Sequence, residues 1–218
     1  MAEMKVALCG DFYAGKSTLA CTLGERGWTV LDHTGLLKRL ASDALRFTGK
    51  TVSVDELNRD KPRYRSFLKE FGSVIGWDEG FGVERCIDEW TEQGRPVPVV
   101  LDNVRNEAQW RPLERLGFTL VRLVVPGHII EQRARDLGVS RESLREMLRP
   151  ENSFRVPHVD GEISLDCFER VDRHPFHEDP LGMDRVVGGF RQFTPDEVAT
   201  NLEQVLSSLV EEPLGVGL

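Results

Sequence analysis

The chain has 218 residues, of which 40% are hydrophobic, and a formal net charge of −8 at pH 7. Its length and apolar content suit one α/β domain over residues 1–218, with an insertion, better than two independent domains. The acidic balance argues against binding duplex nucleic acid through its phosphates. No run approaches the roughly 18 apolar residues of a membrane span, and the first strand begins too early for a targeting peptide. We therefore expect a cytoplasmic protein.

The N-terminal segment carries the sharpest motif. An apolar run over 6–9 predicts a buried strand, a helix-forming run covers 16–23, and the sequence GDFYAGKS lies at 10–17. This octapeptide fits the phosphate-binding loop, or P-loop, G-x-x-x-x-G-K-[ST], in which backbone N–H groups and the helix start bind phosphates. The residues expected to bind ATP are Gly10, Asp11, Ala14, Gly15, Lys16, Ser17 and Thr18. Lys16 reaches the β- and γ-phosphates, and the Ser17 hydroxyl ligates Mg²⁺.

Apolar and helical stretches alternate along the next part of the chain. Strands are predicted over 28–31, 97–101 and 118–125. Helices are predicted from about residue 32 to 45, and over 54–58, 64–75, 83–92 and 107–116. Such alternation is typical of a parallel sheet flanked by helices. With the phosphate-binding loop, the pattern predicts a P-loop NTPase-type three-layer sandwich around a five-stranded parallel sheet.

Residues 128–180 form a charged, proline-interrupted excursion. Two short helices are predicted there, with Gly138 between them and Ser140 capping the second. An excursion of this kind is typical of a lid, and a rigid surface insertion is the alternative. A weak final strand over 184–190 and a helix starting at Thr194 follow, with Glu197 completing a capping box.

Several looser motifs follow the loop in the order known from one kinase family. LKRLA at 37–41, RSFLKEFGS at 65–73, VLDNVRNE at 100–107 and LVVPG at 123–127 resemble "PLK-x-x-A", "R-x-L-x-Q-x-x-G-T", "D-V-R-x-x-N-E" and "V-x-R-P-G". The chain thus resembles the phage-type deoxynucleoside monophosphate kinases over nearly its whole length. The resemblance implies ATP-dependent phosphorylation of a deoxynucleoside monophosphate, and a location in the host cytoplasm if a phage encodes the protein.

The chain also departs from that family. Lys69 stands where glutamine is usual, Val125 replaces a basic residue, and the "D-V-R" segment is shifted by one position and shortened by two. These departures concern the substrate more than the fold. The accepted base, the choice between ribo- and deoxyribonucleotides, and homodimer formation are left open by the sequence.

Phosphoryl transfer needs cations placed around two sets of phosphates. On the donor side Lys16 is joined by Asp102, which follows a buried strand and is expected to act with Mg²⁺, or else as a turn cap. Arg105 and Arg65 are expected to hold the acceptor phosphate through their guanidinium forks, although either can be a plain surface charge. Arg133 is expected to close over the donor from the lid. Arg133 and Arg135 diverge on a helix, so only one of them points inward.

The remaining substrate-binding candidates are Asp32, Lys38, Lys69 and Trp77. Lys38 offers a cation at the mouth of the site, and Lys69 lies on the pocket helix. Trp77 belongs to a group of aromatic residues that either sandwich the acceptor base or fill the core. Asp32 is either a helix cap or the base that a hydroxyl acceptor requires.

Two other functions remain open on the sequence. One is a kinase acting on a hydroxyl, like dephospho-coenzyme A kinase or a nucleoside kinase, with Asp32 as its base. The other is a nucleotide-hydrolysing switch protein, which the absence of an N-K-x-D motif disfavours.

Overall fold

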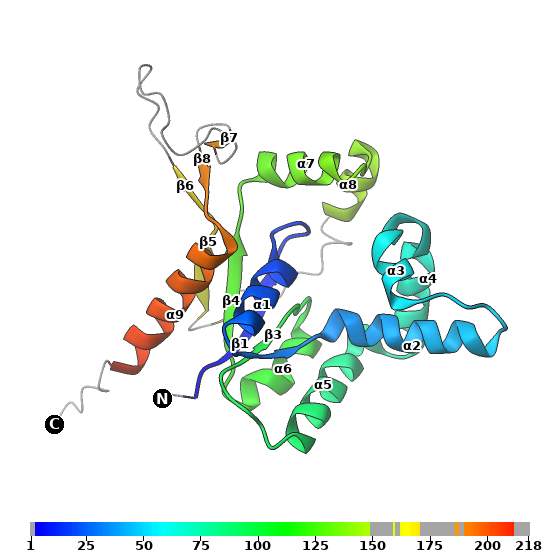
Figure 1. Ribbon diagram of the computed structural model, residues 1–218, viewed down its shortest axis with the longest axis horizontal. Coiled ribbons are helices and arrows are strands. Elements are labelled where there is room, and N and C mark those ends of the chain that lie inside the picture. The colour runs from blue at the N-terminus through cyan, green and yellow to red at the C-terminus, as the bar shows by residue number, and fades with distance from the viewer. Residues whose placement is uncertain (1–2, 149–158, 160–161, 171–185, 188–189, 212–218) are drawn as a thin grey trace.

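A central parallel sheet with helices on both faces organises the computed structural model of the chain (Figure 1). The structure describes residues 3–148, 159, 162–170, 186–187 and 190–211. The sheet has five strands in the order β2-β3-β1-β4-β5. They are β1 (Lys5–Gly10), β2 (Thr29–Leu31), β3 (Val99–Leu101), β4 (Thr119–Val124) and β5 (Ile163–Asp166). The predicted α/β fold with a five-stranded parallel sheet is confirmed.

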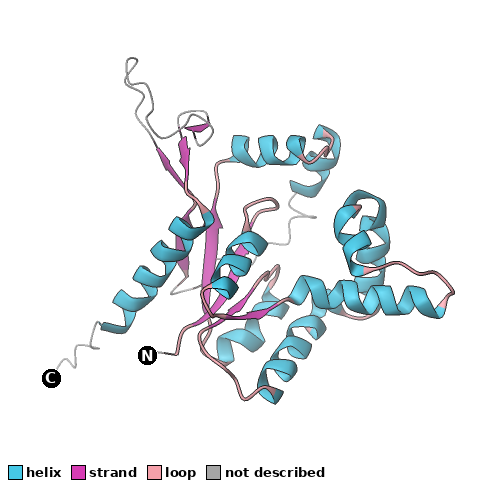
Figure 2. Cartoon of the chain, in the orientation of Figure 1, coloured by secondary structure: helices cyan, strands magenta, loops and turns pink. Residues whose placement is uncertain are grey.

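The two faces of β1 supply both layers of the core, because successive side chains of a strand point to opposite sides. Val6 and Leu8 pack in the cluster that α1 (Lys16–Glu25) and α9 (Pro195–Glu211) cover. Ala7 and Cys9 pack in the other cluster. That cluster is covered by α2 (His33–Phe47), α5 (Phe81–Glu92) and α6 (Glu107–Arg115). Figure 2 shows the resulting helix–sheet–helix layers.

Two helical units flank the loop between β1 and α1 (Figure 1). One contains α3 (Val54–Arg59), α4 (Lys61–Val74) and the 3₁₀ turn η1 (Trp77–Glu79), and it lies beside α2. The other contains α7 (Gly127–Asp136) and α8 (Arg141–Leu148). The Ser140 hydroxyl accepts the backbone N–H of Ser143 at 3.1 Å, so the predicted cap of α8 is confirmed. Both units end up beside the phosphate-binding loop.

The predicted position of the last sheet strand is wrong. The fifth strand is β5, inside the excursion predicted over 128–180. The sequence pattern does not indicate a strand here. Leu165 is buried but Ser164 and Asp166 are exposed, so this edge strand has no continuous apolar run. Instead, β7 (Val186–Val187) and β8 (Phe190–Gln192) form a separate antiparallel sheet with β6 (Phe168–Arg170).

Parts of the predicted lid, at 149–158, 160–161 and 171–180, lie outside the described residues, as do 184–185 and 188–189 of the predicted last strand. The capping box before α9 is confirmed, because Glu197 N–H donates to the Thr194 hydroxyl at 3.2 Å and the Glu197 carboxylate accepts from Thr194 N–H at 2.6 Å. In the described part of the chain, no helix combines the length and apolar character that crossing a bilayer requires.

Candidate active site

The loop after β1 has the backbone geometry of an anion cradle. Gly10 has φ +129°, and a Cβ there would lie 2.8 Å from the carbonyl oxygen of Leu123. Gly15, with φ +100°, precedes α1 in a left-handed conformation that L side chains rarely adopt. No side chain caps this end of α1, and its first turn contains no acidic residue. The first N–H groups and the positive helix end therefore suit a phosphate.

Lys16 folds back over the loop. Its ammonium donates to the carbonyl oxygens of Gly10 at 2.9 Å and Asp11 at 2.8 Å. Burial, and then the charge of Arg105, lower the pKa of Lys16 to about 8 against the opposing carboxylates of Asp102 and Asp11. The other predicted loop residues are Ala14, which is buried, and Ser17 and Thr18, which are exposed on the first turn of α1. Lys16 thus carries its charge at the centre of the loop.

Asp102 follows β3 and is only 4% exposed. Its Oδ1 accepts the backbone N–H of His33 at 3.0 Å, so it caps the start of α2. Burial, and then the Asp32 carboxylate, raise the pKa of Asp102 to about 6, and the N–H groups of His33 and Thr34 oppose the rise. Asp102 is therefore a cap that also lies within electrostatic reach of Lys16. Its role toward Mg²⁺ stays a prediction.

Two polar residues that sequence reasoning missed hold Arg105. With its amide oxygen turned toward the guanidinium, Asn103 accepts from Nε at 2.8 Å and Nη2 at 3.1 Å. Gln109, which is fully buried, accepts the Arg105 backbone N–H at 2.9 Å and donates to the carbonyl of Trp77 at 3.3 Å. Burial lowers the pKa of Arg105, and Asp78 and Asp102 oppose this shift. The only signal for Asn103 was its place inside the strand-end motif.

Arginines from both helical units reach the loop. Arg65, on α4, has its guanidinium carbon 5.4 Å from the centre of the Phe12 ring, and its charge contributes to the lowered pKa of Arg105. Arg133, on α7, donates to the carbonyl of Tyr13 at 2.7 Å. Arg135 instead bonds Gln132 at 3.1 Å on the exposed side of the helix, which confirms that the two arginines diverge. The loop is thus flanked by cations from α4 and α7.

Three other predicted substrate-binding residues lie on α2, α4 and η1. Lys38 donates to the Asn58 side chain at 2.6 Å, between α2 and α3, and Lys69 is exposed on α4. Trp77 is 2% exposed and stacks on the His33 ring at 4.6 Å between centroids. The Trp77 ring is therefore a core element and is not free to stack on a base, which corrects that expectation.

Asp32 caps α2, with Oδ1 accepting the Gly35 N–H at 2.7 Å. Its other oxygen lies 3.9 Å from Arg39. The carboxylate lines a hollow at the sheet edge, formed by β2, α2 and α5 and bordered by Val30, Leu31, Arg39, Cys86, Glu89 and Gln93. The carboxylates that raise the pKa of Lys16 are those of Asp102 and Asp11, and Asp32 is not among them.

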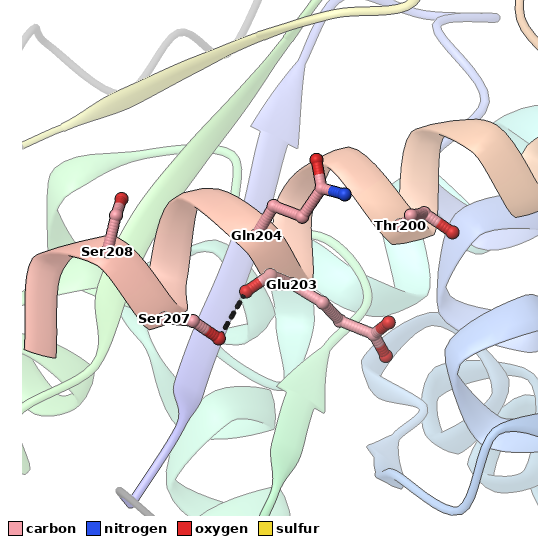
Figure 3. Close-up of a pocket in the computed structure, with 5 residues that line it drawn as sticks. All are labelled: Thr200, Glu203, Gln204, Ser207 and Ser208. Atoms are coloured by element: carbon pink, nitrogen blue, oxygen red, sulfur yellow. Dashed lines mark hydrogen bonds between the residues drawn. The ribbon is translucent and has the colours of Figure 1, made fainter. Parts of the chain in front are cut away.

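A second hollow lies along α9, bordered by Thr200, Glu203, Gln204, Ser207 and Ser208 (Figure 3). Glu203 accepts from Arg26 at 2.9 Å and from the Trp28 indole at 3.2 Å. These contacts tie α9 to the segment after α1. The role of Glu203 is therefore structural.

The chain matches no known protein-family profile and no curated protein. Its structure resembles a sugar kinase from Janibacter sp. HTCC2649, with a TM-score of 0.50, 14% identity and 97% of each chain covered. A gluconokinase from Sinorhizobium meliloti 1021 scores 0.49 at 13% identity, with 96% of this chain and 94% of that chain covered. The Thermus thermophilus protein TT1252 scores 0.49 at 18% identity, with 96% and 99% covered. Of these, the first reaches 0.50, and at 14% identity it shows a shared fold and no more.

Proposed function

We propose that the protein transfers the terminal phosphoryl group of ATP to a nucleoside monophosphate, and that the acceptor is a deoxynucleoside monophosphate. The observation that carries the proposal is the meeting of Lys16, Arg105 and Arg65 beside the phosphate-binding loop. The charge of Arg105 helps to lower the pKa of Lys16, and the charge of Arg65 helps to lower the pKa of Arg105. Like charges that act on one another favour the binding of an anion between them, beyond the carboxylates of Asp102, Asp78 and Asp11 that already face them. The deoxynucleotide rests on the sequence resemblance alone.

In this proposal the loop binds the triphosphate, and Arg65 and Arg105 bind a second anion. A monophosphate carries about two negative charges at neutral pH, and guanidinium groups bind such oxygens in pairs. Holding both phosphates in line is most of what phosphoryl transfer requires. In this proposal Lys16 and Arg133 serve the donor, and Arg65 and Arg105 serve the acceptor. The helices α7 and α8 belong to the lid.

The residues present fit a magnesium ion. Among the described residues no three acidic, histidine or cysteine side chains form a ready metal cage, but Mg²⁺ in kinases takes few protein ligands and keeps waters and phosphate oxygens. The exposed Ser17 hydroxyl would hold the ion, and Asp102 would orient its water. When bound, the ion neutralises charge on the phosphates.

A kinase acting on a hydroxyl of an anionic small molecule is the second candidate. The fold shared with the Janibacter sugar kinase favours it, as does the raised pKa of Asp102, since a hydroxyl acceptor needs a carboxylate base. A phosphate acceptor is already ionised and needs no such base.

Replacing Asp32 by asparagine should leave kcat within about threefold of the wild type, because asparagine caps helices as well as aspartate does. Asp32 lines the hollow at the sheet edge and bonds its own helix. The check is a steady-state assay with thermal denaturation as the fold control. A loss of about three orders of magnitude in kcat with an unchanged Tm would instead identify Asp32 as a base for a hydroxyl acceptor.

The proposed function is tested with purified protein, ATP, Mg²⁺ and a panel of acceptors. The panel contains normal and modified deoxynucleoside monophosphates, the matching ribonucleotides, nucleosides and gluconate. Diphosphate formed only when a monophosphate is present would support the proposal. Phosphorylation of gluconate or a nucleoside alone would support the second candidate. Steady phosphate release without any acceptor would contradict both and support a hydrolytic switch.

The pH dependence of kcat/KM should be bell-shaped, with limbs at about 6 and about 8. Asp102 loses its charge as the pH falls through about 6, because its pKa is raised, and Lys16 loses its charge as the pH rises through about 8, because its pKa is lowered. The acceptor phosphate also titrates near about 6. Asp102→Asn distinguishes the two groups: if its residual activity keeps an unchanged acidic limb, that limb belongs to the phosphate and not to Asp102.

A further inference from the structure

The His33 side chain is buried after β2 without a hydrogen bond. It is 1% exposed, and neither Nδ1 nor Nε2 has a partner. Burial, and then the charge of Arg105, lower the pKa of His33 to about 3, so the imidazole is neutral. The Asn103 backbone lies close enough to the ring to oppose this shift as a backbone hydrogen bond would, although neither ring nitrogen has a partner in full hydrogen-bond geometry. Among the described side chains, the Trp110 indole N–H is the other buried polar group left unpaired.

An imidazole without hydrogen bonds is energetically unfavourable at this buried position. A buried donor or acceptor without a partner lowers the stability of the folded state, and native proteins pair nearly all such groups. The ring's visible contact is its stack on Trp77, with 22° between the planes. Phenylalanine would stack in the same way with no polar atom to leave unpaired. The ring nitrogens are therefore best explained by a contact made in another state of the enzyme.

The surroundings of His33 are those of the acceptor side of the site. Its backbone N–H donates to Asp102 at 3.0 Å. The nearby cation is Arg105, which Asn103 holds through its side chain. His33 thus lies next to Asp102 and within electrostatic reach of Arg105, the proposed acceptor arginine.

We propose that His33 is an acceptor-binding residue: a ring N–H donates to an oxygen of the anionic group that Arg105 and Arg65 hold. The inference rests on the proposed function. The ring nitrogens are buried in this structure, so the proposed contact requires α2–α4 and the segment after β3 to rearrange around the acceptor. A neutral donor adds a directed contact to the anion without adding another positive charge to Lys16, Arg65 and Arg105.

The test is His33→Phe, which keeps the stack on Trp77 and removes both nitrogens. The acceptor KM should rise about tenfold to hundredfold, as expected for one hydrogen bond to a charged group. The KM for ATP should stay within about twofold, and the Tm should not fall, since the change removes unpaired polar atoms. His33→Gln, which restores a donor, should recover most of the acceptor affinity. Trp110→Phe is the matched control, because it removes the other unpaired N–H, and its acceptor KM should equal that of the wild type.

A wild-type acceptor KM in His33→Phe would overturn the inference, and so would an equal loss in His33→Phe and His33→Gln. A binding measurement makes the result independent of turnover. Calorimetry with inorganic phosphate, in the presence of a non-hydrolysable ATP analogue, should give weaker binding to His33→Phe than to wild type, and equal affinity would refute the role. If wild-type protein phosphorylates no monophosphate, the proposed function fails while the phosphate measurement still decides the role of His33.

Discussion

Replacing Lys16 by alanine should reduce kcat at least about a thousandfold while the protein stays folded. The ammonium is the charge at the centre of the phosphate-binding loop, where it bonds the carbonyls of Gly10 and Asp11. Removing one well-placed donor from a transition-state site costs about 10²–10³ in rate, and Lys16 adds a full charge. Because burial lowers its pKa below that of the unfolded chain, protonation of Lys16 opposes folding. The Tm of the variant should therefore not fall.

A kinase assay and thermal denaturation on the same preparation check this expectation. Lys50→Ala is the matched control, because Lys50 is exposed in the loop after α2 and should change neither quantity. Wild-type turnover by Lys16→Ala would refute the assigned donor site. A large drop in Tm would show that the loop needs the ammonium for folding.

Replacing Arg105 by methionine should lower kcat/KM for the acceptor about a hundredfold to a thousandfold and leave the KM for ATP nearly unchanged. In the proposed function this guanidinium binds the acceptor phosphate. The change also removes the guanidinium that faces the carboxylates of Asp78 and Asp102, so some stability is lost. The measurement is a pair of KM determinations, one for each substrate, with calorimetric binding of an ATP analogue as the check on folding.

Arg111→Met is the control for the arginine change. Arg111 forms an exposed ion pair with Glu107 one turn away on α6, and solvent-exposed pairs of this kind contribute little to stability. It should affect neither KM. Equal losses for ATP and acceptor in Arg105→Met would mean that Arg105 serves the whole site and not the acceptor alone.

The elements with strong local signals were predictable. The glycines and Lys16 of the loop, the Asp32 cap of α2 and the Thr194 capping box follow from residue types at fixed spacing. The fifth strand was not predictable in this way. As an edge strand its residues alternate between buried and exposed, so its apolar content falls below that of the inner strands. The sequence-based prediction therefore placed the last strand of the sheet at 184–190, which is C-terminal to its observed position at Ile163–Asp166.

The same distinction between local signals and tertiary packing applies to the side chains around the site. Arg65, Arg105 and Arg133 could be proposed as cations from sequence. The approach of Arg65 and Arg133 to the loop depends on the packing of α4 and α7 beside it, and that of Arg105 on the pairing of β3 with β1. As an aromatic residue, Trp77 was a candidate for stacking on the acceptor base, yet its burial against His33 makes it part of the core.

The sequence by itself determined the phosphate-binding loop, the α/β class and the helix caps, because each depends on backbone conformation and on periodicity over a few residues. Only the tertiary structure decided which charges meet. Parallel pairing brings the ends of β1 and β3 together, so Asp102 and Arg105 come near Lys16, which is 86 residues or more away in the chain. Burial, which sets the pKa of Lys16 and leaves His33 unpaired, is likewise a property of the packed chain and not of any short stretch of it.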